Sequence, residues 1–115
     1  MQAPSSSWQV FAAADLVEQQ AESDDPYLEF LDLPSLSCGI YCLPAGTEDL
    51  QTPHAEDEVY YVMSGRGRLR VGGEERPVGP GSILYVAADA EHRFVEIEET
   101  LTLLVFFAAE EAPGS

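Results

Sequence analysis

The sequence contains two histidines, and each lies close to the start of a segment with the composition of a β-strand. Side chains two or four residues apart in an extended chain point to the same side. His54 and Glu58 can therefore face one interior, and His92 can face it from a second strand. Two imidazoles and one carboxylate on strands form a facial ligand set that leaves coordination positions open for substrate, water or O₂. The spacing therefore offers His54, Glu58 and His92 as candidate ligands of one divalent ion, such as Fe, Mn, Ni or Zn.

A plainer interpretation of the same residues also stands. Both histidines could lie on the surface or pack in a core, and Glu56, Asp57 and Glu58 could be part of an acidic surface run. In that case the chain is a purely structural domain.

Other side chains lie an even number of residues from the candidate ligands and therefore on the same faces of the expected strands. Tyr60 lies on the face of Glu58, and Phe94 on the face of His92, so both could form a pocket wall or simply core. If Glu58 binds a metal, isomerase or hydrolase chemistry needs a separate general base, for which Glu56 and Tyr60 are the candidates by position.

These residues need strands to position them, and the sequence supplies strands. Residues 10–21 are expected to form a short helix, which ends at the acidic stretch before Pro26. After it, short apolar segments alternate with residues that favour turns. The expected strands are 27–33, 37–43, 59–63, 68–71, 82–86, 92–97 and 101–107, with Gly65-Arg66-Gly67 as a hairpin turn. Such spacing predicts an all-β antiparallel sandwich or barrel.

The 115 residues fit a single domain. We expect an N-terminal arm and helix over residues 1–26, a β-barrel core over 27–108 and a flexible tail over 109–115. Segment 101–107 is apolar on both faces, which predicts a central strand or a strand beneath a subunit contact. A homodimer suits so short a chain.

Residues 46–65 resemble the first sequence motif of the cupin family. That motif has a glycine, His-x-His, three or four residues, Glu, six residues and Gly. Here Glu58 and Gly65 match, and His54 takes the place of the second histidine. Thr52 stands where the first histidine would be.

The second cupin motif is Gly, five residues, Pro-x-Gly, two residues, His, three residues and Asn. Gly81 and His92 match it, whereas Ala87, Asp89 and Glu96 replace the proline, the second glycine and the asparagine. The resemblance covers roughly residues 37–107. It implies a double-stranded β-helix of jelly-roll type, usually dimeric, often with one metal held by three His and a Glu. By this resemblance His54, Glu58 and His92 are the ligands.

Thr52 leaves three interpretations of the metal site open. Three protein ligands plus water could hold the ion, Gln51 or Glu56 could act as a surrogate ligand, or the site could have lost its metal and bind an organic ligand through hydrogen bonds. The resemblance accordingly implies a metal-binding oxygenase or isomerase acting on a small organic molecule, or a non-catalytic binding and sensing module.

The charge balance excludes some partners. The 21 acidic residues outnumber five arginines, there is no lysine, and the net charge is −16. Such a chain repels nucleic acid and anionic membranes. The acidic surface favours solubility, or adaptation to high salt, where its self-repulsion is screened. With no signal peptide or membrane span evident, we expect a cytoplasmic protein, and Cys38 and Cys42 are too far apart on one strand for a disulfide.

Overall fold

The structure is a computed structural model, and it describes residues 7–49 and 55–109. Its elements follow one another as a helix and then strands. They are α1 (Ala13–Glu22), β1 (Tyr27–Asp32), β2 (Leu36–Leu43), β3 (Glu58–Val71), β4 (Glu74–Val78), β5 (Ile83–Val86) and β6 (His92–Ala108). The fold is all-β apart from α1, as the sequence predicts.

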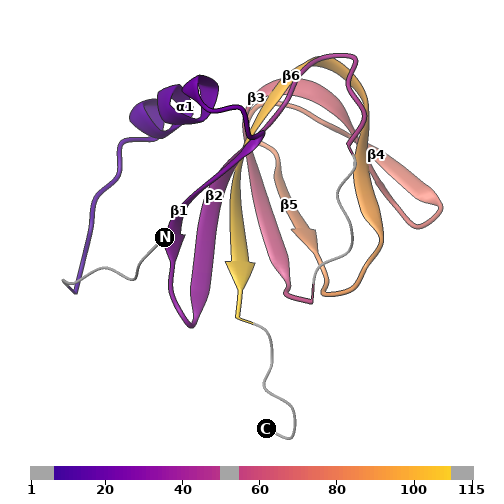
Figure 1. Cartoon of the computed structure of the whole chain (residues 1–115). Coiled ribbons are helices and arrows are strands. Elements are labelled where there is room, and N and C mark those ends of the chain that lie inside the picture. Colours follow the sequence, from indigo (N-terminus) through magenta and orange to yellow (C-terminus); the bar gives the residue numbers. More distant parts are fainter. Residues whose placement is uncertain (1–6, 50–54, 110–115) are drawn as a thin grey trace, which may run out of the picture.

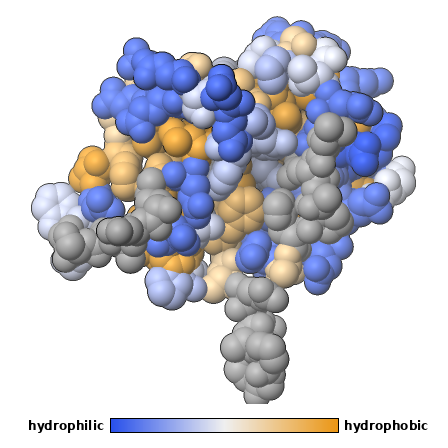
Figure 2. Space-filling view, in the orientation of Figure 1, coloured by the Kyte–Doolittle hydropathy of each residue, from blue (hydrophilic) through white to orange (hydrophobic). Residues whose placement is uncertain are grey.

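All strand pairs are antiparallel, and the strands follow the order β1-β2-β6-β3-β4, with β5 also paired to β3. β6 is therefore a central strand, which confirms one of the two expectations for the apolar segment 101–107. Figure 1 shows the sheet curving strongly around its interior, with α1 outside it on the side of β1 and β2. Hydrophilic residues cover most of the same view of the surface, and hydrophobic residues are visible between them (Figure 2).

Two long strands replace four predicted short ones. β3 runs through residues 59–63 and 68–71 without a break, and β6 runs through 92–97 and 101–107. The predicted hairpin turn at Gly65-Arg66-Gly67 is therefore wrong. The glycines lie where the register between β3 and β6 shifts, so they bend a continuous strand instead of reversing it. β4 was not predicted, because its sequence Glu-Glu-Arg-Pro-Val shows little apolar alternation.

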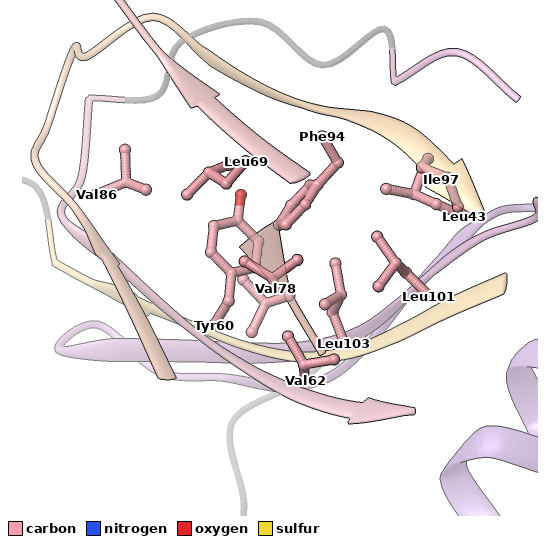
Figure 3. Close-up of a cluster of buried hydrophobic side chains, with 11 residues drawn as sticks. Leu43, Tyr60, Val62, Leu69, Val78, Val86, Phe94, Ile97, Leu101 and Leu103 are labelled. Atoms are coloured by element: carbon pink, nitrogen blue, oxygen red, sulfur yellow. The ribbon is translucent and has the colours of Figure 1, made fainter. Parts of the chain in front are cut away.

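The core fills the interior of the curved sheet (Figure 3). Side chains alternate strictly at the start of β3, where Glu58, Tyr60 and Val62 are buried while Val59 and Tyr61 are exposed. β6 shows the same period of two at Leu101, Leu103 and Val105. The core cluster contains Leu43, Tyr60, Val62, Leu69, Val78, Val86, Phe94, Ile97, Leu101, Leu103 and Val105.

The helix covers the outer face of the sheet. It begins at Ala13 instead of residue 10 and ends at Glu22, one residue later than predicted, and no side chain caps its N-terminus at Ala12. Leu16 is buried against the sheet, and Cys38 faces the same side, so this cysteine does not line the interior. Both cysteines are free. Within the described residues, no helix has the length and apolar character to cross a membrane.

Candidate functional site

The first residues of β3 and β6 meet inside the fold. Glu58 begins β3 and His92 begins β6, and each side chain is only 1% exposed. The Oε1 atom of Glu58 lies 3.1 Å from the Nε2 atom of His92. Two residues that are 34 positions apart in the sequence are thus brought into direct contact, away from solvent.

Tyr60 joins this pair through its hydroxyl group. The hydroxyl donates a hydrogen bond to Oε2 of Glu58 at 2.7 Å and lies 3.0 Å from Nε2 of His92. Figure 3 shows the Tyr60 side chain projecting into the core, with its oxygen toward Leu69. Phe94 packs edge-to-face against the Tyr60 ring, at a centroid distance of 5.2 Å, and keeps it in place.

His92 is oriented by a hydrogen bond on the other side of its ring. Nδ1 lies 2.9 Å from the carbonyl oxygen of Ala90, which can only accept, so Nδ1 carries a proton and Nε2 faces Glu58. Burial alone would lower the pKa of His92. The hydrogen bonds to Glu58 and Ala90 and the charges of Glu58 and Asp49 outweigh that effect and raise it. The site is therefore a strongly polar spot in an apolar interior.

Asp49 is a buried carboxylate that the sequence did not reveal. It is 1% exposed, accepts a hydrogen bond from the backbone N–H of Phe94 at 2.8 Å, and accepts another from the Tyr41 hydroxyl at 3.0 Å. Asp49 therefore holds the backbone of β6 in position close to His92. Nothing in its sequence context separates it from the other acidic residues of the chain, because its burial results only from the tertiary fold.

A cavity of about 510 Å³ opens beside the site. Tyr60 lines it and is also the residue that contacts Glu58 and His92. Other aromatic walls are Tyr27, Tyr41 and Phe107, and its carboxylates are Glu29, Asp32 and Glu56. This volume is within the range of small-molecule sites.

The structure brings together some of the predicted site residues. Glu58, His92 and Tyr60 are in contact, Phe94 supports Tyr60, and Glu56 lines the cavity. Gln51, Thr52 and His54 lie outside the described residues. Across 7–49 and 55–109, no three His, Cys, Asp or Glu residues form a group that could hold a metal ion.

Comparison with known sequences gives two matches. Residues 39–107 match a family model described as a cupin domain. A protein of Streptomyces coelicolor, itself uncharacterized, is 45% identical over 102 residues, which are 89% of this chain and 97% of that protein.

Solved structures share the fold. TT1209 from Thermus thermophilus superposes with a TM-score of 0.70 at 23% identity, over 89% of this chain and 98% of that one. The DMSP lyase DddQ from Ruegeria pomeroyi gives 0.66 at 20% identity, over 80% of this chain but 52% of the lyase. At these identities the likeness concerns the fold.

Proposed function

This chain belongs to the cupin domain family, and from that membership and the site geometry we propose that it binds one divalent metal ion in its barrel through His54, Glu58 and His92. A small organic molecule would bind beside the ion, in the cavity lined by Tyr60. The observation that carries the proposal is the buried contact between the Glu58 carboxylate and the His92 imidazole.

The donor atoms are of the types that bind divalent metal ions, a carboxylate oxygen and an imidazole nitrogen. Oε1 of Glu58 and Nε2 of His92 lie 3.1 Å apart, the length of a hydrogen bond, so a bound ion would take the place of the proton between them. The anchored Nδ1 of His92 leaves Nε2 as the atom directed at the site, as is usual for an imidazole ligand held by a second hydrogen bond.

The chain's own residues define what could happen beside the ion. A divalent ion there would supply Lewis-acid or oxygen chemistry, the chemistries of isomerases and oxygenases. Tyr60 would present a hydroxyl to the bound molecule, and Glu56 on the cavity wall could accept a proton from it. The core around Tyr60 would keep water from the inner end of the cavity.

One observation favours a second candidate, a metal-free module that binds a small molecule without turnover. Tyr60, Glu58 and His92 already satisfy one another's hydrogen-bonding needs. Among the described residues no buried side-chain nitrogen or oxygen lacks a partner. A site of this kind could hold a ligand in the cavity through hydrogen bonds that the ligand donates to Glu56 on its wall.

Metal content distinguishes the two candidates. We expect protein incubated with Fe(II), Mn(II), Ni(II) or Zn(II) to retain close to one equivalent after desalting, measured by plasma mass spectrometry. Glu58→Gln and the double variant His54→Ala/His92→Ala should retain at least about tenfold less, because each loses a charged or imidazole donor.

Glu56→Gln is the matched control, because it removes the same charge two residues away. It should retain the metal, whereas loss of metal in this variant would instead identify Glu56 as a ligand. Wild-type protein that takes up none of the four ions would overturn the metal proposal and leave the metal-free module.

The homodimer is a further proposal, and it has an identifiable surface. Val59 lies opposite Tyr85, and Tyr61 lies opposite Ile83, on the outer face of β3 and β5. The four side chains are 37%, 66%, 40% and 72% exposed, in that order. Soluble monomers seldom expose adjacent large apolar residues. We infer a second copy as the occupant, because two chains of charge −16 approach with least repulsion across an uncharged surface.

Light scattering after size-exclusion chromatography tests the dimer. The wild type should have twice the 12.5 kDa mass of one chain, and Ile83→Glu should have the mass of a single chain, because it buries a carboxylate in the interface. Val10→Glu, at an 81% exposed apolar residue elsewhere, should remain dimeric. A monomeric wild type would exclude the proposed interface.

A further inference from the structure

The cavity beside Tyr60 is lined by negatively charged side chains that have no part in the proposed set of metal ligands. Glu29 and Asp32 of β1 line it together with Glu56, which precedes β3. None of these three carboxylates forms an ion pair in the part of the chain that the structure describes. A ligand in this cavity therefore meets three negative groups that the described chain leaves uncompensated.

The positive charges of the chain lie elsewhere. The sequence has no lysine, and none of the five arginines lines the cavity. Arg66, Arg68 and Arg70 lie in the second half of β3 and pair with glutamates of β4 and β6. An anionic ligand would consequently find no cationic partner among the described cavity walls.

Aromatic rings form another part of the wall, beside aliphatic side chains such as Leu36 and Val105. The Tyr27 ring lies edge-to-face with Tyr41 at 6.2 Å and with Phe107 at 6.3 Å. The Tyr27 ring passes over Gly39, where any Cβ would overlap it, so this glycine provides the space for the ring. Ring faces attract cations through their quadrupole, and the attraction adds to that of nearby carboxylates.

The two tyrosines respond to this environment. Burial, together with Glu29 near Tyr27 and Asp49 near Tyr41, raises the pKa of both phenols. They therefore remain neutral hydroxyls at physiological pH. The carboxylate charges that contribute to these shifts would also disfavour an anionic ligand and favour a cationic one, whereas burial disfavours a charge of either sign.

We propose that the cavity binds a small organic cation, an amine or guanidinium compound, with its charged group among the carboxylates of Glu29 and Asp32 and the ring of Tyr27. The inference rests on the proposed function only in that the uncharged part of the molecule would extend to Tyr60 and the candidate metal site. The cavity volume, its aromatic wall and its uncompensated carboxylates together define this ligand class.

Three probes that share a phenylethyl group and differ in charge test the proposal, namely phenethylammonium, 2-phenylethanol and 3-phenylpropionate. Binding to the full chain is followed by calorimetry and by NMR shifts of cavity residues. Phenethylammonium should bind at least about tenfold more tightly than 2-phenylethanol, and 3-phenylpropionate should not bind. Glu29→Gln/Asp32→Asn should abolish the preference for the cation.

Glu18→Gln/Glu22→Gln is the matched control, because it makes the same change in net charge on the exposed face of α1. It should keep the preference. Equal binding of the cation and the alcohol, equal loss in both double variants, or no saturable binding of the cation would overturn the proposal. Each titration is repeated on metal-loaded and on chelator-treated protein. Cation binding without metal uptake would then contradict only the metal proposal. Metal uptake without cation binding would contradict only the proposal of a cation site.

Discussion

Gly65→Ala is expected to lower the free energy of unfolding by about 3 kcal/mol or more, which is a large fraction of the stability of a small domain. Gly65 has a φ of +95°, a backbone conformation that costs energy for any residue with a Cβ atom. An added Cβ would also overlap the carbonyl of Thr100 on β6. That contact is with backbone, so it cannot be relieved by a change of rotamer. Chemical denaturation followed by circular dichroism measures the effect.

Gly46→Ala provides the control for the backbone conformation alone. Gly46 has a φ of +78°, and a Cβ there would meet no atom within 4 Å. Gly46→Ala should lower the free energy of unfolding by about 1–2 kcal/mol. Equal losses in the two variants would mean that the close approach of β3 and β6 at Gly65 is unimportant.

Asp49→Ala is expected to lower the free energy of unfolding by about 3 kcal/mol. Asp49 lies outside the set of predicted site residues. The substitution leaves the Phe94 N–H and the Tyr41 hydroxyl without their acceptor. It also releases the start of β6, so we expect broadened NMR signals for His92 and Phe94. Asp49→Asn keeps one acceptor oxygen and should cost about half as much.

Asp57→Ala separates this effect from the loss of any carboxylate. Asp57 is exposed and accepts a hydrogen bond from the Ala88 N–H at 2.8 Å. Water can replace that acceptor, so the cost should not exceed about 1 kcal/mol. A loss at Asp49 no larger than at Asp57 would contradict the structural role assigned to Asp49.

The contact between Glu58, Tyr60 and His92 was partly predictable, because it depends on a period of two. Parity along a strand places Glu58 and Tyr60 on one face without any knowledge of the fold. Both residues are buried, and His92 meets them from β6, as expected. The assignment of His54, Glu58 and His92 as metal ligands remains a prediction, as does the location in the cytoplasm.

Features that depend on distant pairing were not predictable. Gly65 looked like a turn because glycine is common in hairpins, and only its partner on β6 reveals a bend within a strand. Asp49 and Glu29 looked like any other acidic residues of a chain with 21 of them. Their burial, or their place on a cavity wall, follows from which strands become neighbours.

The position of β6 has a consequence for how the chain folds as it is synthesised. β6 is the last of the described elements to be translated, yet it lies between β2 and β3. Until it emerges from the ribosome, both neighbours have unpaired edges, and strands with unpaired edges tend to join other chains. The charge of −16 keeps nascent chains apart during that interval. The acidic composition thus opposes association through strand edges that stay unpaired until β6 is made.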